Sequence, residues 1–410
     1  MTSKITKNTS FSTANDLETK TKNTRKAAST STATPQSDTA TCLENSQNRP
    51  IIVFTGGGTG GHVYPNLALV PEFEKRGFEI AYAGGEGNTL ERRLARAEGI
   101  KYYAVPSIKL VRSMSGAAIK NNLKIPVELN RALKKAKDVL EQIKPDCVFS
   151  KGGFVSLPIV LAASKAHIPV FAHESDYTLG LDNKIAKLKG ATIFKANPKA
   201  KFDGIFVGMP LRENLLRKDK IEAQKTLDIN NPFKKPVLLV FGGSSGASAI
   251  NEAVKKNIKS LTSKYYVLHV TGKNKDEKIS ASDYRAFEYA DDISLFYTAC
   301  DVILSRAGAT SVFEISSIGK RAVFVPLPKG ASRGDQIYNA DLAKEYGGIV
   351  LKQDSSFCDN FVGAIETAMQ NPPMKPIKHD SNGKIADVVC DKLRRGEKCK
   401  NKKPSPNGLP

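Results

Sequence analysis

The sequence predicts an α/β protein with two doubly wound domains in tandem. A short apolar run, Ile51–Phe54, is followed by a glycine-rich loop, Thr55–His62, and then by a helical pattern. The same order recurs downstream, where Val237–Phe241 leads into Gly242–Gly246 and a second helical pattern. Short apolar runs of this kind are typical of fully buried parallel strands. Because each opening heads its own alternation of strands and helices, we expect two sheets and a cleft that receives loops from both.

The first glycine-rich loop is typical of an anion site. Glycines let a phosphate approach the main chain, and the helix start behind them presents N–H groups to it. Gly56, Gly58 and Gly61 also fit G-x-G-x-x-G, so the loop alone is compatible with a nicotinamide dinucleotide site or with a plain tight turn. His62 favours a functional role, because a plain turn has no use for a titratable side chain. Pro65 is expected in the first turn of the helix.

The remaining elements follow from the hydrophobic pattern and from Gly and Pro at the turns. The expected strands are 79–83, 102–105, 147–150, 170–172, 302–305 and 321–326. The expected helices include 89–98, 127–143 and 155–166.

Composition bounds the class of protein. The 410 residues are 40% hydrophobic, which is enough for large cores and predicts two or three domains. We find no apolar run long enough to span a bilayer and no cleavable leader, so the protein is expected to be soluble and intracellular. The six cysteines show no C-x-x-C spacing, which argues against a zinc site or a disulfide framework.

A net charge of +21 indicates an anionic partner. Charge alone is compatible with nucleic acid, an anionic membrane or a phosphorylated substrate. The chain has no Trp and no aromatic-studded basic strand of the kind that reads single-stranded RNA. We therefore expect no nucleic-acid partner.

Changes in composition mark the two ends of the chain, and the segment after Val207 marks the crossing between the two expected domains. Residues 1–49 are rich in Ser, Thr, Asn and Lys and are expected to be a disordered leader. The first domain is expected over 50–207 and the second over 208–375. Residues 376–410 are expected to form a helix that returns to the first domain, followed by a basic tail.

One cationic stretch of the first half admits two interpretations. Ile108–Met114 mixes apolar and basic residues, and basic residues continue to Lys135. Such a segment can insert apolar side chains into a membrane surface while its cations face anionic lipid. An ordinary amphipathic helix with a solvated lysine face would look the same.

Further candidate residues follow the ends of predicted strands, where open parallel sheets place ligands. Lys151–Phe154 follows one strand, and His173–Asp176 follows another. We expect His173 to be a buried, hydrogen-bonded structural residue. His173 and Glu174 are adjacent and cannot form an i, i+4 metal pair, so a metal site is not expected.

The second half repeats the pattern with hydroxyls and charges. Arg212 lies where the chain passes into the second domain and could bind a phosphate, or could pair with a surface carboxylate. Arg306–Ser311 opens a helix and could form a second phosphate site. Glu314, one turn into that helix, could accept hydrogen bonds from ribose hydroxyls or could simply favour the helix dipole.

Together these stretches resemble a known family. The chain from Ile51 to about Arg395 is similar to the bacterial N-acetylglucosaminyltransferases that convert lipid I to lipid II in peptidoglycan synthesis. Seven ordered motifs across both halves carry the resemblance: TGGGTGGHVYPNLAL, KGGFVSLP, HESDYTLGLDNKIA, VGMPLRE, VFGGSSGASAIN, SRAGATSVFEI and FVPLPKGASRGDQIYNA.

The resemblance implies a GT-B fold and an inverting transfer from UDP-N-acetylglucosamine to lipid I, without a cofactor or an obligatory metal. The substrate-binding residues that it implies are Thr59, Gly60, Gly61, Arg212, Ser244, Ala309, Thr310, Ser311, Glu314 and Gln336. His62 is the first candidate for the general base and Asp176 the second. The family often has Asn at the position of Asp176, which puts a sugar contact there in doubt.

The resemblance also implies a place in the cell. Because the acceptor is a lipid, the protein is expected at the cytoplasmic face of the bacterial membrane, bound peripherally to an anionic surface. Two alternatives are weighed against it, an NAD-dependent Rossmann enzyme and a basic nucleic-acid-binding protein. The first would leave the second glycine-rich half without a function.

Overall fold

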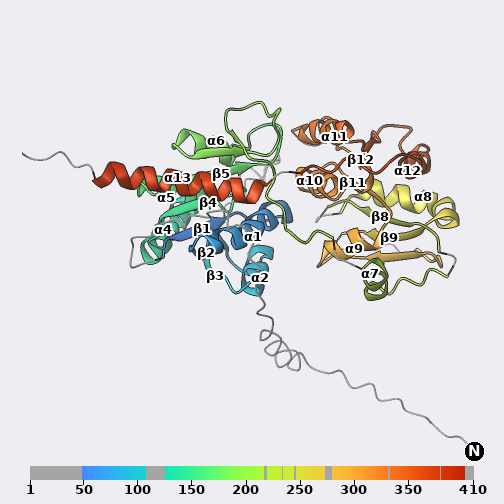
Figure 1. Ribbon diagram of the computed structural model, residues 1–410, viewed down its shortest axis with the longest axis horizontal. Coiled ribbons are helices and arrows are strands. Elements are labelled where there is room, and N and C mark those ends of the chain that lie inside the picture. Colours follow the sequence, from blue (N-terminus) through green and yellow to red (C-terminus); the bar gives the residue numbers. More distant parts are fainter. Residues whose placement is uncertain are drawn as a thin grey trace, which may run out of the picture. The chain divides into compact units, whose positions relative to one another are not determined.

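The chain folds into two parallel sheets covered by helices (Figure 1). The computed structural model describes residues 49–107, 125–216, 219–232, 234–243, 246–272, 279–330, 333–378 and 380–401. The predicted leader, apart from Arg49, lies outside these ranges, as do residues 108–124 of the cationic stretch and residues 402–410 of the tail.

Sheet 1 contains seven parallel strands in the order β3-β2-β1-β4-β5-β6-β7. Its strands are β1 Ile51–Thr55, β2 Glu79–Gly85, β3 Lys101–Val105, β4 Cys147–Ser150, β5 Val170–Glu174, β6 Thr192–Lys195 and β7 Ile205–Phe206. Its helices are α1 Gly60–Lys75, α2 Leu90–Ala97, α4 Ile125–Ile143, α5 Leu157–Lys165, α6 Leu181–Leu188 and, from the end of the chain, α13 Ser381–Asn401.

Sheet 2 contains six parallel strands in the order β10-β9-β8-β11-β12-β13. Its strands are β8 Val237–Phe241, β9 Tyr266–Val270, β10 Tyr284–Phe287, β11 Val302–Arg306, β12 Arg321–Val325 and β13 Ile349–Val350. Its helices are α7 Lys220–Thr226, α8 Ser248–Lys264, α9 Ile293–Ala299, α10 Ala309–Ser317, α11 Asp335–Glu345 and α12 Phe361–Gln370. Both sheets are doubly wound, so the predicted fold class is confirmed.

Apolar cores on both faces of each sheet hold the helices in place. In sheet 1, Phe54 of β1 packs edge-on against Phe73 of α1 and Phe149 of β4, with ring centroids 5.7 Å apart in both pairs. Helices α1, α2 and α13 share that core, and α4, α5 and α6 cover the other face. Burial of such aromatic rings is the main favourable term for folding.

The end of the chain returns to sheet 1. Figure 1 shows α13 beside the elements of the first half, and Ile385, Val389 and Leu393 are buried in the same core as Phe54. Arg76, the residue that follows α1, forms an ion pair with Asp387 of α13 at 2.6 Å. Helix α13 is therefore part of the first half, although it is last in sequence.

Two expectations need correction. Helix α1 begins at Gly60, so Pro65 lies in its second turn and not in its first. The apolar stripe of α1 extends back to Val63, which is fully buried and draws the helix start towards the glycines. The second expectation concerns the cysteines, whose spacing argued against disulfides. Cys147, Cys300 and Cys358 are free thiols, as that expectation requires, but Cys390 is disulfide-bonded.

Candidate active site

The loops at the centre of each sheet open into one cavity. The strand order reverses between β1 and β4 in sheet 1 and between β8 and β11 in sheet 2. Open parallel sheets bind ligands beyond the carboxyl ends of the strands at such points. The loops after these four strands all line one cavity of about 850 Å³. Two of them approach closely, because a Cβ added to Gly61 would lie 3.2 Å from Thr310 Oγ1.

Every predicted site residue that the structure describes lines this cavity. They are Thr59, Gly60, Gly61, His62, Asp176, Arg212, Ala309, Thr310, Ser311, Glu314 and Gln336. Ser244 lies outside the described residues. His173 is not among the residues that line the cavity. It is fully buried on β5, and its Nε2 lies 2.9 Å from the Gly208 carbonyl oxygen, as expected for a structural histidine.

The first glycine-rich loop leaves a helix start facing the cavity. Gly58 adopts a φ of +82°, which favours glycine and turns the chain into α1. Thr59 precedes α1, but its side chain makes no capping hydrogen bond. The first N–H groups of a helix have no partner within the helix and carry a partial positive charge. This end of α1 is therefore suited to bind an anion.

His62 is held in a defined tautomer. Its Nδ1 lies 3.1 Å from the Gly57 carbonyl oxygen, which can only accept a hydrogen bond. Nδ1 therefore carries the proton in the neutral ring, and Nε2 keeps a lone pair. Burial lowers the pKa of His62, and the charge of Lys151 lowers it further, against the Gly57 hydrogen bond and the charges of Asp182 and Glu174. His62 is thus a neutral ring that can accept a proton at Nε2.

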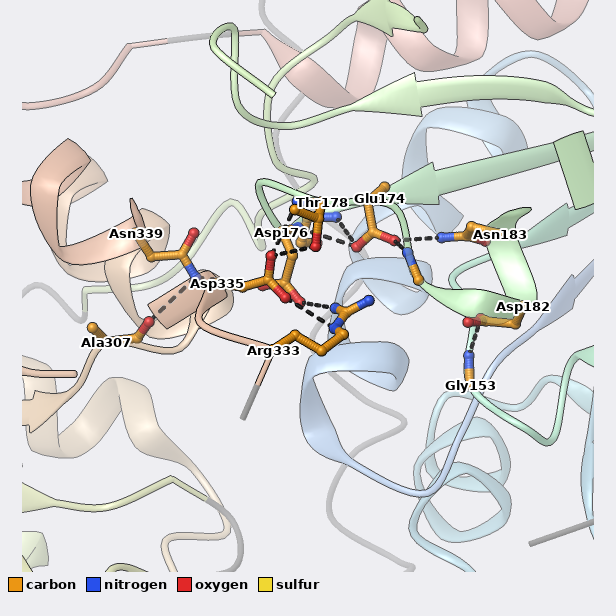
Figure 2. A network of polar contacts seen from close by, with 12 residues as sticks. Gly153, Glu174, Asp176, Thr178, Asp182, Asn183, Ala307, Arg333, Asp335 and Asn339 are labelled. Atoms are coloured by element: carbon orange, nitrogen blue, oxygen red, sulfur yellow. Dashed lines mark hydrogen bonds and ion pairs between the residues drawn. The ribbon is translucent and has the colours of Figure 1, made fainter. Parts of the chain in front are cut away.

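The loop after β4 closes around His62. Gly153 has a φ of +88°, and a Cβ added to it would lie 3.0 Å from His62 Nδ1. Its N–H donates to Asp182 Oδ2 at 2.5 Å, as Figure 2 shows. Asp182 lies in the first turn of α6, so this bond fixes the loop to that helix. The glycine is needed because the imidazole occupies the space of a side chain.

Asp176 belongs to a network that joins loops of both halves (Figure 2). Its Oδ2 forms an ion pair with Arg333 Nη2 at 2.9 Å, and Arg333 Nε pairs with Asp335 Oδ2 at 2.9 Å. Thr178 donates to Asp335 Oδ1 from its main-chain N–H at 3.0 Å and from its hydroxyl at 2.6 Å. Glu174 holds the loop itself by accepting from the N–H groups of Asp176 and Gly180.

This network perturbs Asp176. Burial, together with the charges of Glu174 and Asp335, raises the pKa of Asp176 to about 6, although Arg333 and Asn339 oppose the shift. A raised carboxyl pKa means that the folded protein binds the proton more tightly than the unfolded chain does. The stability that this provides is present at pH below about 4 and is lost as the pH rises through about 6.

Asp176→Asn should therefore change stability in a pH-dependent way. Asparagine keeps the shape and removes the buried charge, so the difference in Tm, variant minus wild type, is expected to rise from pH 5 to pH 8. Thermal unfolding at several pH values measures it. Asp391→Asn, at an exposed position of α13, is the control and should give a flat difference. If the Tm difference for Asp176→Asn stayed flat or fell as the pH rose, the raised pKa of Asp176 in the folded protein would be contradicted.

Arg212 and Glu314 lie side by side at the cavity wall. Arg212 comes from the segment that connects the two halves, and Glu314 comes from α10. Arg212 Nη2 lies 3.8 Å from Glu314 Oε1, which is within ion-pair range but too long for a hydrogen bond. The guanidinium lies 4.7 Å from the centroid of the Tyr64 ring. Its Nε and Nη2 are buried without a hydrogen-bond partner among the described residues. Unsatisfied buried donors are costly, so the cavity is arranged to receive an acceptor here.

Glu314 is buried and held in position. Tyr297 donates to its Oε2 at 3.0 Å. Burial raises the pKa of Glu314, while the charge of Arg212 and the Tyr297 hydrogen bond lower it. Glu314 lies beyond the first turn of α10, so the alternative of a first-turn Glu that favours the helix dipole does not describe this carboxylate, which lines the cavity.

The start of α10 and the start of α11 complete the second half of the site. Gly308 precedes α10 and provides no side-chain cap, so the N–H groups of Ala309, Thr310 and Ser311 face the same cavity as those of α1. Gln336 Oε1 accepts from the main-chain N–H of Leu327 at 3.1 Å, which fixes the amide at the cavity wall.

Several cavity residues were not identified as functional from the sequence. They are Asp182, Arg333 and Asp335. The segment 329–335 follows a predicted strand, which is the signal that could have found Arg333 and Asp335. Lys151 belongs to the candidate stretch 151–154 that the sequence did indicate. Among the described residues, no group of three or more His, Cys, Asp or Glu side chains could hold a metal ion. Within the same part of the chain, no helix is long and apolar enough to cross a membrane.

The fold and the cavity define a class of protein. Two facing Rossmann-type sheets with one cavity between their switch points are the arrangement of GT-B glycosyltransferases. A structure titled Acinetobacter baumannii MurG is similar with a TM-score of 0.59 and 22% identity, over 84% of this chain and 100% of that one. The kitacinnamycin glycotransferase gives a TM-score of 0.56 at 15% identity over 84% of this chain and 100% of that one. The protein is a glycosyltransferase.

Sequence relatives give the family. Residues 52–194 match the glycosyltransferase family 28 N-terminal domain, and residues 237–389 match the C-terminal domain of that family. A Clostridium botulinum protein named UDP-N-acetylglucosamine--N-acetylmuramyl-(pentapeptide) pyrophosphoryl-undecaprenol N-acetylglucosamine transferase is 41% identical over 74% of this chain and 86% of its own length. A Clostridium perfringens protein of the same name is 39% identical over 78% of this chain and 90% of its own length.

The chain belongs to this family of N-acetylglucosamine transferases within glycosyltransferase family 28. The resemblance inferred from the seven motifs is thereby confirmed. The comparisons support the glycosyltransferase and not the NAD-dependent enzyme or the nucleic-acid-binding protein that the sequence left open.

Proposed function

We propose that the protein transfers N-acetylglucosamine from UDP-N-acetylglucosamine to the 4-hydroxyl of the N-acetylmuramoyl residue of lipid I, forming lipid II with inversion at the anomeric carbon. The observation that carries the proposal is the single cavity that the glycine-rich loops of both sheets line, with Arg212 at its wall, whose Nε and Nη2 make no hydrogen bond within the described part of the chain. The names of the relatives supply the two substrates.

Each half has its own substrate in this proposal. Residues 50–207 hold the acceptor, whose diphosphate lies against the start of α1. Residues 208–375 hold the UDP-sugar, whose diphosphate lies between the start of α10 and Arg212. Glu314 accepts hydrogen bonds from the ribose hydroxyls, and Gln336 contacts the sugar. Two negatively charged diphosphates need two separate anion sites, and the two helix starts provide them.

The transfer is a single displacement with His62 as the base. The 4-hydroxyl oxygen of the acceptor attacks the anomeric carbon of N-acetylglucosamine, and the bond from that carbon to the UDP oxygen breaks on the opposite face. The hydroxyl proton passes to His62 Nε2, which the Nδ1–Gly57 hydrogen bond leaves free to accept it. The lowered pKa of His62 keeps the ring unprotonated before the reaction.

The leaving diphosphate is stabilised by fixed donors. Negative charge develops on UDP as the bond breaks, and the first N–H groups of α10 and the guanidinium of Arg212 are placed to meet it. Donors held in position before the reaction cost no reorganisation when the charge appears. In this proposal the N–H groups of α10 and the guanidinium of Arg212 stabilise the negative charge of the departing diphosphate.

We also propose that the protein binds the cytoplasmic face of the membrane peripherally. Support comes from the net charge of +21 and from α4, where Val127 is 74% exposed and the basic residues Arg131, Lys134 and Lys135 are exposed. A surface that presents both apolar and cationic side chains suits an anionic headgroup layer.

Transfer from labelled UDP-N-acetylglucosamine to a lipid I analogue tests the activity. The expected product carries the label on the lipid-linked acceptor and is accompanied by stoichiometric UDP. An undecaprenyl diphosphate without the muramoyl sugar is the matched control and should accept no label. Release of free N-acetylglucosamine without labelled lipid, or equal labelling of the control lipid, would contradict the proposal.

A further inference from the structure

Lys151 is an unusual residue for its position. It directly follows β4 at the switch point of sheet 1, and its side chain is only 3% exposed. Lysine is almost never this buried unless it is paired. Its main-chain N–H donates to the Thr55 carbonyl oxygen at 2.9 Å, so its backbone continues the pairing of β4 with β1.

The side chain of Lys151 connects two loops of the site. Its Nζ donates to Ser175 Oγ at 2.5 Å, in the loop that carries Asp176. On the other side, a Cβ added to Gly56 would lie 3.2 Å from Lys151 Cβ, so the first glycine-rich loop packs directly on its stem. Met209 also contacts Ser175, with Sδ 3.2 Å from Oγ. Lys151 therefore fills the space between the first glycine-rich loop and the loop after β5.

The charges of three carboxylates act on the ammonium group. Burial lowers the pKa of Lys151, while the charges of Glu174, Asp176 and Asp182 oppose that shift. These three groups come from β5, the loop after it and α6. They favour the charged form of Lys151, which burial disfavours.

The same charge acts on His62. Lys151 lies close to His62, since a Cβ added to Gly56 would lie 3.2 Å from Lys151 Cβ and 3.0 Å from the His62 carbonyl oxygen. The charges that act on the His62 ring are those of Lys151, Asp182 and Glu174. Lys151 opposes protonation of the ring, and the two carboxylates favour it. Without Lys151 the carboxylates would act alone, and the ring would protonate at higher pH.

We propose that Lys151 is a positioning residue for the transfer: its buried side chain joins the first glycine-rich loop to the loop after β5 and places its ammonium charge beside His62, the proposed base. The inference rests on the proposed function, because it requires His62 to be the base. Lys151 acts through His62 and Ser175 and does not need to touch the reacting atoms.

The test measures the titration of His62 directly. In protein with ¹³C-labelled histidine, the His62 signal is assigned with His62→Gln and followed by NMR from pH 4.5 to pH 8.5. Lys151→Gln removes the charge but can still donate to Ser175, and it is expected to move the His62 titration to higher pH. Lys151→Arg keeps the charge and is expected to leave it in place. Lys165→Gln, at an exposed position of α5, is the matched control.

Activity gives the second readout. The acidic limb of the pH profile of kcat/KM should move to higher pH in Lys151→Gln, while KM for UDP-N-acetylglucosamine at pH 8 stays as in wild type. Ser175→Ala, which removes only the hydrogen bond and keeps the charge, should leave the acidic limb in place. If Lys151→Gln does not fold, Lys151→Met also removes the charge at similar volume and should move the acidic limb in the same direction. A His62 titration unmoved by Lys151→Gln, or an acidic limb moved by Ser175→Ala, would overturn the role of Lys151.

The two proposals fail in different ways. The NMR titration needs no acceptor, so it reports on Lys151 even if the substrate has been misassigned. A wild-type protein that transfers nothing to lipid I would refute the proposed function, whereas an unmoved His62 titration would refute only the role of Lys151.

Discussion

Replacing His62 with alanine is expected to lower kcat about 100-fold to 10,000-fold, which is the usual contribution of a general base. Nε2 is the group that the Gly57 hydrogen bond leaves ready to take a proton, and alanine offers no substitute. The affinity for UDP should remain as in wild type, because the proposed UDP site lies at α10 and Arg212. Single-turnover transfer and calorimetric titration with UDP measure the two effects.

A second histidine provides the control. His167 is exposed and has a φ of 57°, a left-handed conformation that asparagine tolerates. His167→Asn should therefore keep wild-type turnover. If His62→Ala also kept it, His62 would have no part in the proton transfer, and Asp176 would become the first candidate for the base.

Glu314→Gln is expected to raise KM for UDP-N-acetylglucosamine about 10-fold to 100-fold, the range for losing one hydrogen bond to a charged acceptor. Two carboxylate oxygens can accept from two vicinal hydroxyls, whereas an amide has one acceptor oxygen. Tyr297 would also compete for that single oxygen, since it already donates to Glu314 Oε2. Because the hydroxyl contacts are made before the transfer, kcat should change less than KM.

A donor analogue distinguishes recognition from general damage. Wild type should bind 2′-deoxy-UDP more weakly than UDP, and this preference should shrink in Glu314→Gln. Glu252→Gln, at an exposed position of α8, is the control and should keep both KM and the preference. If Glu314→Gln preferred UDP over 2′-deoxy-UDP as strongly as wild type does, Glu314 would not bind the ribose hydroxyls.

The strands and the glycine-rich loops could be predicted because their signals are local. Ile52, Val53 and Phe54 form a continuous apolar run, and all three side chains are fully buried. The expected strand 170–172 was too short, since β5 continues to Glu174. His173 and Glu174 pair with Phe194 and Lys195 of β6, so neighbouring backbone groups extend a strand beyond its apolar run.

The charge network could not be predicted from the sequence. Asp176 and Arg333 are far apart in the chain and meet only because both sheets place their loops at one cavity. The burial of Lys151 was hidden for a different reason. Lysine normally lies in solvent, whereas here the hydrogen bond to Ser175 and the charges of Glu174, Asp176 and Asp182 favour a buried ammonium group, and these groups meet only in the fold.

The return of α13 has a consequence for how the protein is made. The core under Phe54 includes Ile385, Val389 and Leu393, which leave the ribosome after the whole second half. Domains usually fold in the order of synthesis. Here the first half cannot complete the core under Phe54 until α13 has been synthesised, so the apolar face that α13 covers stays exposed until translation is nearly complete. A fragment ending before Ser381 would keep that face open, so the two halves cannot be separated by a single cut.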